Sequence, residues 1–431
     1  MRRVLLLGAS GFVGSALAAA LIADGHEVHA LGRDLPRGRA VMPGASWQQC
    51  DLRRMASAGD WAPFLVGVDV IVNASGALQS GLRDDVELVQ DRAIRALVEA
   101  AARAGVAHFI QVSAAYAAQQ VTSFMQSKAR ADAALAASGV PYTILLPGLM
   151  IGRNSFGGTE LLRACAGLPI AVEISGTGPL QCIALADVVA AMRRALADPA
   201  ARGRFDLVEA EPRSLGTIIA LHRAWLGLPP PRLSLRLPVA MLRPAALLAD
   251  ALGWLGWRSP LRSNALAALV HGVRGDVAQS RALLGREPLT LAQTFAALGP
   301  AGKADRWHAR IAPLYALALA SLVLLWLAGG VVGLVWRDTA AALLAASGIS
   351  PGLAMLLVIG GSLADIAIGL AILYRPTLKP ALTAGAMLAA GYALGASVLR
   401  PSLWLDPLGS VVKIVPLIAL MLLCRAMAEE R

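Results

Sequence analysis

The chain has 431 residues, a net charge of +11 at neutral pH and a hydrophobic fraction of 57%. It is too long for a single domain of ordinary size and too apolar for an ordinary soluble protein. Its arginines are scattered and form no basic run interleaved with aromatic residues, so nucleic-acid binding is not expected. A positive surface beside anionic lipid headgroups explains the charge more simply.

The cysteines and histidines show no pattern of a metal site. The four cysteines lie far apart without a CxxC pair, and the six histidines are dispersed. This favours a reducing compartment and argues against a disulfide framework. We therefore expect no bound metal.

The chain begins with a short apolar run, Val4–Leu7, followed by glycines at GxxGxxG spacing and a helical stretch over 15–24. The early glycines favour a buried strand over a signal peptide. A strand, a glycine turn and a helix in this order are typical of a dinucleotide-binding loop, in which the backbone approaches a pyrophosphate at the helix N-terminus. The predicted cofactor-binding residues here are Gly8, Ser10, Gly11, Phe12, Val13 and Gly14.

The second predicted strand, 27–31, leads to Arg33 and Asp34. A guanidinium at this place suits the 2′-phosphate of NADP, whereas a carboxylate suits the ribose of NAD. We expect Arg33 to select NADP(H) over NAD(H). The alternative is that Asp34 bonds the ribose of NAD.

Strand-like runs then recur at 46–50, 68–72, 108–112 and 142–146, with a helix predicted over 86–104. The alternation predicts an α/β fold with a doubly wound parallel sheet, whose ligand lies at the carboxyl ends of the strands. The predicted cofactor-binding residues at those ends are Asp51, Leu52, Asn73, Ala74, Ser75, Lys128 and Pro147.

The stretch 233–257 is unusually apolar for a soluble region, although prolines, arginines and Asp250 interrupt it. It could lie in the membrane interface and open a substrate pocket towards lipid, or it could be ordinary core.

Four apolar stretches of bilayer length follow, over about 311–336, 352–374, 380–399 and 408–427. They predict an all-α bundle of four transmembrane helices after a linker at 301–310. The flanks on the side of the N-terminal region carry six basic residues and the opposite flanks carry two, Arg337 and Arg400. The positive-inside rule then predicts cytoplasmic N- and C-termini in a bacterial-type inner membrane.

Two ionisable residues, Asp365 and Lys413, fall inside the predicted spans. Such residues are costly in lipid and usually face the bundle interior. They could pair with each other, or Lys413 could extend to the interface.

The first 300 residues resemble the short-chain dehydrogenase/reductase superfamily. They are closest to its extended and atypical branch, which includes sugar-nucleotide epimerases, NmrA-like proteins and an accessory subunit of respiratory complex I. The residues that carry the resemblance are Gly8, Gly11, Gly14, Asp51, Leu52, 73–76, Ser113, Lys128, Pro147, Gly148, 183–188 and 283–290. It implies a nucleotide-binding domain over 1–150 and a smaller substrate-side subdomain over 151–300.

The superfamily uses a serine, a tyrosine and a lysine, the last two spaced YxxxK on one helix, where the ammonium makes the phenol a usable acid or base. Ser113 and Lys128 match, but Phe124 stands at the tyrosine position. Lys128 and Lys303 are the only lysines in the first 310 residues, which favours a specific role for Lys128. Tyr116 is a further candidate catalytic residue. Cofactor binding is thus better supported than turnover.

The segment 311–431 resembles the DoxX-like family of small membrane proteins, through its span count and the loop 403–407. Two functions follow. The chain is an NAD(P)-dependent oxidoreductase or epimerase acting on a hydrophobic small molecule such as a quinone or lipid. Alternatively, it is a non-catalytic NADP(H)-binding module that senses redox state or stabilises a membrane protein partner.

Overall fold

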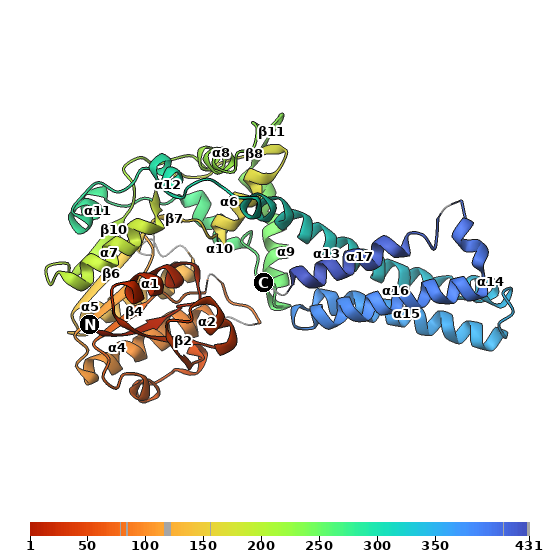
Figure 1. Ribbon diagram of the computed structural model, residues 1–431, viewed down its shortest axis with the longest axis horizontal. Coiled ribbons are helices and arrows are strands. Elements are labelled where there is room, and N and C mark those ends of the chain that lie inside the picture. The colour runs from red at the N-terminus through yellow and green to blue at the C-terminus, as the bar shows by residue number, and fades with distance from the viewer. Residues whose placement is uncertain (78, 83–84, 116–121, 156, 408, 429–431) are drawn as a thin grey trace. The chain divides into compact units, whose positions relative to one another are not determined.

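The computed structural model describes residues 1–77, 79–82, 85–115, 122–155, 157–407 and 409–428 (Figure 1). The chain forms two compact units. The first comprises Met1–Gly253 and Arg258–Ala309, and the second comprises Trp254–Trp257 and Arg310–Arg431.

A seven-stranded parallel sheet forms the centre of the first unit, in the order β10-β6-β5-β4-β1-β2-β3. The strands are β1 (Arg3–Leu7), β2 (Glu27–Gly32), β3 (Ser46–Gln49), β4 (Val70–Asn73), β5 (His108–Val112), β6 (Tyr142–Pro147) and β10 (Gly203–Leu207). The order reverses between β1 and β4, where an open α/β sheet binds its ligand. The predicted doubly wound fold is confirmed.

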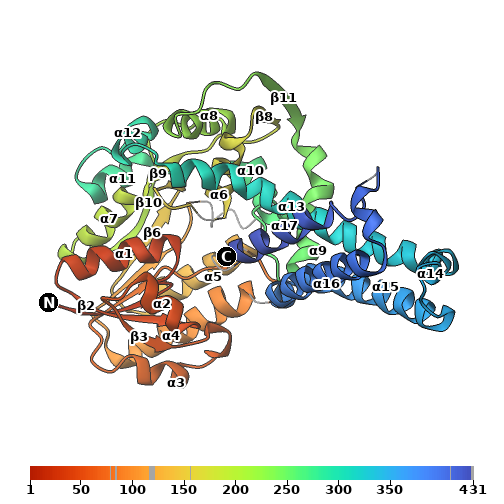
Figure 2. The same cartoon turned by 45° about the vertical axis from the view of Figure 1, so that its right-hand side comes forward.

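Helices cover both faces of this sheet (Figure 2). In β1, Val4 and Leu6 pack with α1 (Phe12–Ala23) and α7 (Leu185–Ala197). Leu5 and Leu7 pack on the other face with α3 (Ala58–Trp61), α4 (Ala93–Ala104) and α5 (Ser123–Ala137). Alternate residues of a strand point to opposite faces, so one continuously apolar strand serves both cores. Helix α2 (Leu35–Val41) follows β2.

The rest of the first unit is a smaller, mixed region. It contains the strand pairs β7 (Leu149–Ile151) with β9 (Cys182–Ala184) and β8 (Ile170–Ser175) with β11 (Leu233–Pro238). Its helices are α6 (Gly158–Gly167), α8 (Leu215–Trp225), α9 (Arg243–Trp254), α10 (Ser263–His271), α11 (Val277–Leu284) and α12 (Leu291–Ala297). Between them, α7 and β10 return to the main sheet, so residues 185–207 belong to its architecture.

The resemblance-bearing segments 183–188 and 283–290 meet in this region. The carboxylate of Asp187, at the start of α7, is fully buried and pairs with Arg286 at 2.5 Å. Its second oxygen accepts a hydrogen bond from the backbone N–H of Leu289 at 2.8 Å. These two contacts fix the closing segment of the first unit against the sheet.

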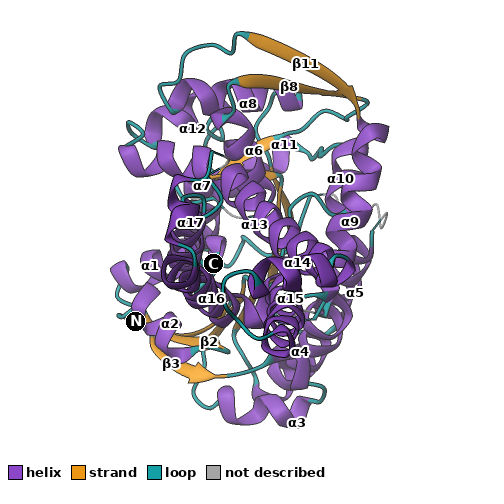
Figure 3. Ribbon diagram, turned by 90° about the vertical axis from the view of Figure 1, so that its right-hand side faces the viewer, coloured by secondary structure: helices purple, strands orange, loops and turns teal. Residues whose placement is uncertain are grey.

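The second unit is helical (Figure 3). It contains most of α13 (Lys303–Val335), α14 (Arg337–Ala345), α15 (Pro351–Leu373), α16 (Leu378–Leu399) and α17 (Ile414–Met427). Helix α13 begins at Lys303, within the segment predicted as a linker. Three described helices are long and apolar enough to cross a membrane, namely Lys303–Val335, Pro351–Leu373 and Arg375–Leu399.

The fourth predicted span is not a helix of bilayer length. Helix α17 has 14 residues, about 21 Å at 1.5 Å per residue, against a hydrocarbon core of about 30 Å. Gly409 has a φ of +63° and the chain turns before Ile414. The prediction from apolar composition made this helix too long, because composition does not reveal the turn.

Of the two alternatives for Asp365 and Lys413, the structure does not show the pairing. The Asp365 carboxylate accepts a hydrogen bond from the Tyr392 hydroxyl at 2.8 Å. Lys413 is the exposed residue that precedes α17. The polar partner of Asp365 is instead Tyr392 on the neighbouring helix α16.

All four cysteines are free. Burial raises the pKa of the Cys50 thiol to about 11. Burial also raises the pKa of Cys182 and of half-buried Cys165.

Candidate functional site

The glycine loop after β1 is packed so closely that two of its glycines have no room for a side chain. Gly8 has a φ of +79°, and a Cβ there would lie 2.7 Å from the carbonyl oxygen of Ala74. A Cβ on Gly14 would lie 2.0 Å from the carbonyl oxygen of Gly8. Gly11 is exposed, and its Cβ would meet only the Gly8 oxygen, at 3.2 Å. Gly8 and Gly14 therefore build the turn, while Gly11 keeps its outer surface clear.

Helix α1 begins at this loop, and no acidic side chain lies at its start. Gly11 is the N-cap, no side chain caps the helix, and its first turn holds no acidic residue. Ser10 is exposed, and Phe12 and Val13 are half-buried. The positive end of a helix with uncapped N–H groups is a favourable site for phosphate. The loop thus fits the pyrophosphate of a dinucleotide.

The two candidate selectors after β2 have different surroundings. Arg33 is exposed, and its charge is close enough to Asp51 to contribute to lowering the pKa of that carboxyl. Asp34 is the N-cap of α2, and its side chain accepts a hydrogen bond from the backbone N–H of Arg37 at 3.0 Å. One oxygen of Asp34 is therefore already engaged by the helix, and the neighbouring Arg33 is an exposed residue.

Asp51 and Leu52 follow β3. The Asp51 carboxylate pairs with Arg53 at 2.6 Å, and the guanidinium of Arg53 is the main cause that holds the pKa of Asp51 below its usual value. Leu52 is half-buried against the core that contains α3, α4 and α5. Asp51 also caps the short turn that begins at Leu52.

A buried hydrogen-bond network follows β4 at the switch point. The Asn73 oxygen accepts from the backbone N–H of Ser75 at 3.0 Å and from its hydroxyl at 2.6 Å. The Asn73 amide donates to Gln111 of β5 at 2.8 Å. Asn73 thus shapes the 73–75 turn, which carries Ala74 against Gly8. The sequence analysis missed Gln111, although it is paired with Asn73 in the strand register.

Lys128 of α5 lies beneath this turn. Its ammonium donates to the carbonyl oxygens of Ser75 and Val112, each at 3.0 Å, and the side chain is buried. Desolvation lowers the pKa of Lys128 to about 8. An ammonium has three N–H donors. With two engaged by carbonyls, the third can donate to a ligand at the carboxyl ends of β4 and β5.

Ser113 contacts a buried acid. Its hydroxyl donates to the carboxylate of Asp132 at 2.5 Å. Burial raises the pKa of Asp132, and the hydrogen bond from Ser113 and the charge of Lys128 oppose that rise. Lys128 and Asp132 are four residues apart and share one face of α5. The sequence analysis missed Asp132, although this spacing was a signal that could have found it.

Two further residues of the sequence analysis, Phe124 and Pro147, are described by the structure. Phe124 is half-buried on α5, one turn before Lys128, at the position of the missing tyrosine. Pro147 is buried at the end of β6, and its carbonyl accepts from the backbone N–H of Ala115 at 3.0 Å. Tyr116 lies outside the described residues. Because a phenyl ring has no exchangeable proton, Phe124 cannot act as the general acid.

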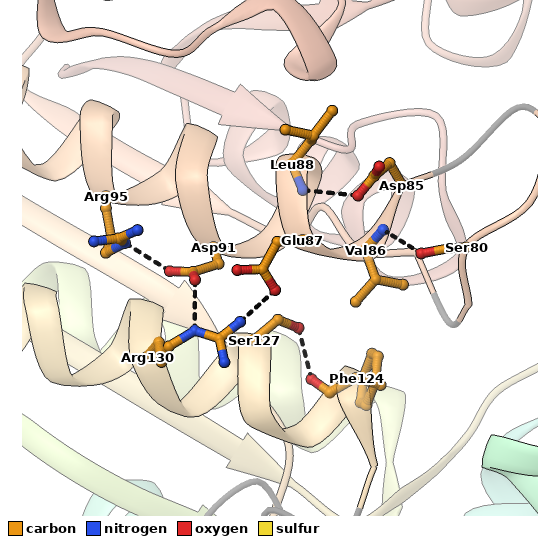
Figure 4. Close-up of polar contacts among 10 residues, drawn as sticks. All are labelled: Ser80, Asp85, Val86, Glu87, Leu88, Asp91, Arg95, Phe124, Ser127 and Arg130. Carbon is orange, nitrogen blue, oxygen red and sulfur yellow. Dashed lines mark hydrogen bonds and ion pairs between the residues drawn. The ribbon is translucent and has the colours of Figure 1, made fainter.

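Helix α5 is held in place by a charged cluster on its other side (Figure 4). Asp91, in the π-helical turn η3 (Glu87–Arg92), is 1% exposed and pairs with Arg130 at 2.5 Å and with Arg95 at 2.7 Å. Arg130 also contacts Glu87. A π-helical turn commonly marks a functional region. The cluster fixes the rotation of α5 and hence the position of Lys128.

Among the described residues, no group of three or more His, Cys, Asp or Glu side chains could hold a metal ion. The expected absence of a metal stays a prediction for the whole chain.

The comparisons with known proteins divide the chain in the same way. Residues 8–199 match an NAD(P)H-binding family, and residues 323–422 match the DoxX-like family. Sterol demethylase protein B of Methylococcus capsulatus is 28% identical over 323 residues, which cover 68% of this chain and 95% of that protein. A 3-diazoavenalumate denitrifying reductase of a Streptomyces species is 28% identical over 287 residues, covering 58% and 88%.

Solved structures show the same fold for the first unit. The NADPH-dependent quinone oxidoreductase QOR2 of Escherichia coli, complexed with NADPH, is 20% identical with a TM-score of 0.53, covering 68% of this chain and 99% of that one. The enzyme WbmG of Bordetella bronchiseptica, in complex with NAD, is 17% identical with a TM-score of 0.53, covering 71% and 94%. The chain therefore joins an NAD(P)H-binding domain to a DoxX-like domain. That domain and the three apolar helices indicate a membrane-associated protein.

Proposed function

We propose that this chain, which joins an NAD(P)H-binding domain to a DoxX-like domain, is a membrane-anchored oxidoreductase that reduces a lipid-soluble substrate. One observation supports it most. The glycine loop, the uncapped N-terminus of α1 and the buried Lys128 ammonium meet around the same turn, where Ala74 packs on Gly8 and the Ser75 carbonyl accepts from Lys128. The cofactor cradle is complete, although the tyrosine of the YxxxK pattern is missing.

Each residue of the cradle has a definite task. Gly8, Gly11 and Gly14 admit the pyrophosphate, and α1 places its positive end against that charge. Lys128 orients the nicotinamide ribose through its third N–H. The bound cofactor supplies the hydride. Phe124 supplies no proton, so the substrate takes its proton from solvent.

This division of tasks favours an acceptor that needs no enzyme-held acid, such as a quinone. Two observations support a hydrophobic substrate class. The relatives and neighbours include proteins named for a sterol and a quinone. The β11–α9 region of this chain also exposes large apolar side chains, namely Leu233 (66%), Leu235 (50%), Met241 (64%), Leu247 (66%), Leu248 (62%) and Trp254 (66%). These side chains are not core, and a lipid interface would cover them.

We further propose that the cofactor is NADP(H). The exposed Arg33 guanidinium can form charge-assisted hydrogen bonds with the 2′-phosphate. One carboxylate oxygen of Asp34, the competing ligand for the ribose of NAD, accepts the hydrogen bond that caps α2.

The orientation rests on the loop charges. With both termini cytoplasmic, which requires the segment around the 14-residue helix α17 to cross as a fourth span, six basic residues flank the inner ends of the apolar segments and two flank the outer ends. The membrane is then a bacterial-type inner membrane, and the nucleotide domain meets cytosolic NADPH.

The second candidate is a non-catalytic NADP(H)-binding module that senses redox state or stabilises a membrane protein partner. Two observations favour it: Phe124 lacks a hydroxyl, and the Ser113 hydroxyl is committed to Asp132 at 2.5 Å. Such a module would bind NADPH but would not oxidise it.

The deciding experiment uses the full chain purified in mild detergent. Bound nucleotide is identified by mass spectrometry, and loss of the reduced nicotinamide absorbance is followed with a short-chain quinone. We expect oxidation of NADPH by the wild type and none by Gly11→Val, which cannot admit the pyrophosphate. Nucleotide binding without oxidation of NADPH by any of several quinones, sterol ketones and lipid aldehydes would establish the second candidate instead.

A further inference from the structure

The membrane-capable helices α15 and α16 carry a polar pair whose role the nucleotide site does not explain. The Tyr392 hydroxyl donates to Oδ1 of Asp365 at 2.8 Å and also lies 3.2 Å from the carbonyl oxygen of Gly361. Asp365 stands eight residues before the end of α15 at Leu373, about 12 Å along the helix axis. The pair therefore lies well inside the apolar length of the helix.

The second carboxylate oxygen of Asp365, Oδ2, accepts no hydrogen bond from the residues that the structure describes. Helix α13 passes this oxygen with Gly329, and a Cβ on Gly329 would meet only Oδ2, at 3.9 Å. A Cβ on Gly329 meets no other atom within 4 Å, so there is room beside the free oxygen on the side of α13.

The pair is also accessible from outside the helices. Tyr392 is 39% exposed and Asp365 is half-buried. A carboxyl group that faces hydrocarbon without a partner costs several kcal/mol. A group that hydrogen-bonds the free oxygen removes that cost, so the site favours an occupant with a polar end.

We propose that Asp365, Tyr392 and the space beside Gly329 form a lipid-facing recess. It binds the carbonyl or hydroxyl end of a lipid-soluble molecule. The free Oδ2 accepts a hydrogen bond from a ligand hydroxyl, and in its protonated form it donates to a ligand carbonyl. The apolar flanks of α13, α15 and α16 hold the body of the ligand. We refer to Asp365, Tyr392 and Gly329 as the recess.

The chemistry of the recess argues against a metal cation. It offers one carboxylate and one phenol, whereas hard cations in proteins take six or more oxygen ligands. No cluster of three acidic, histidine or cysteine side chains occurs among the residues that the structure describes. A neutral hydrogen-bonding head with an apolar tail matches one free oxygen inside a lipid-facing surface.

An apolar carbodiimide tests the recess directly, because dicyclohexylcarbodiimide enters lipid and modifies carboxyl groups that it can reach there. The full chain in phosphatidylcholine vesicles, without nucleotide, is treated with the reagent, and the modified peptides are identified by mass spectrometry. We expect modification of Asp365 in the wild type. Asp338, which is 83% exposed at the start of α14, serves as the reference carboxyl group, which we expect a water-soluble carbodiimide to modify.

The ligand is represented by a short-chain quinone and, separately, by its quinol. At ten times its dissociation constant, either probe leaves about one site in eleven free and slows Asp365 modification about tenfold. Gly329→Leu fills the recess without removing a polar group, so protection by the probe disappears. Gly360→Leu is the matched control. It adds the same side chain at an open glycine on another face of α15, and protection persists.

Three outcomes overturn the proposal. Asp365 stays unmodified while the reagent modifies other carboxyl groups, or both probes leave its rate unchanged, or Gly329→Leu is protected as well as the wild type. A crosslinked dimer whose formation alone shields Asp365 would identify a second copy of the chain as the occupant. Gly11→Val must behave as the wild type here, which separates a failure of the recess from a failure of the nucleotide site.

Discussion

A side chain added at Gly11 would meet different surroundings from one added at Gly14. Substituting each glycine with alanine should therefore separate a loss of nucleotide binding from a loss of stability. A methyl group on Gly14 would lie 2.0 Å from the Gly8 oxygen, more than 1 Å inside contact distance, and the atoms it meets are backbone. We expect Gly14→Ala to cost about 3 kcal/mol, at the upper end for overpacking. For a domain of this size each kcal/mol lowers Tm by about 2–4 °C, so Tm falls by about 6–12 °C.

A methyl group on Gly11 meets a single atom at 3.2 Å and otherwise points away from the protein. The loss of a glycine N-cap costs about 1 kcal/mol or less, and Tm falls by no more than about 4 °C. The methyl occupies the surface that the pyrophosphate must approach, so NADPH affinity falls at least about tenfold. Thermal unfolding by intrinsic fluorescence and a fluorescence titration with NADPH measure the two effects. Unchanged NADPH affinity in Gly11→Ala, or an unchanged Tm in Gly14→Ala, would refute the loop geometry.

Three further predictions concern the selector, the lysine and the topology. Arg33→Ala should weaken NADPH binding about ten- to a hundredfold, the worth of a charge-assisted hydrogen bond of about 1.5–3 kcal/mol, and leave NADH nearly unchanged. Equal weakening of both cofactors would exclude Arg33 as the selector. The pKa of Lys128 falls to about 8 in the folded protein, so the unfolded chain binds the extra proton between about pH 8 and 10.5. The unfolding free energy of the wild type should therefore rise across that window relative to Lys128→Met. Parallel pH profiles of Tm for the two proteins would contradict this. Reporter fusions after Lys379 and Arg431 should indicate the cytoplasm and those after Arg337 and Arg400 the opposite side, and an outside signal at Arg431 would refute the proposed orientation.

The sheet and its glycine loop could be predicted because their signals are local. A buried parallel strand needs a continuous apolar run such as Val4–Leu7, and a turn that approaches the next strand needs glycine at positions 8 and 14. The position of Lys128 at the site was implied by the resemblance to the short-chain dehydrogenase/reductase superfamily, whose YxxxK spacing it matches from position 124. These features depend on residues close together in the chain or on the rigid rules of parallel sheets.

The residues that contact them were harder to predict from the sequence. Gln111 meets Asn73 only through the register of β4 and β5, and Asp132 reaches Ser113 only once α5 has packed on the sheet. In the second unit, apolar composition could not reveal the turn that shortens α17, nor the pairing of Asp365 with Tyr392. Such contacts join distant segments, and their geometry depends on packing that a single sequence does not specify.

The buried thiols have a practical consequence for labelling. Maleimides react with the thiolate, and a Cys50 with a pKa of about 11 is almost entirely protonated at neutral pH. Cys182 is 1% exposed, and its pKa is raised as well. A cysteine introduced into an exposed loop would therefore be alkylated much faster than these two native ones. Site-directed spectroscopic probes could then be attached to the nucleotide domain while Cys50 and Cys182 stay in place, which preserves the core that both of them help to fill.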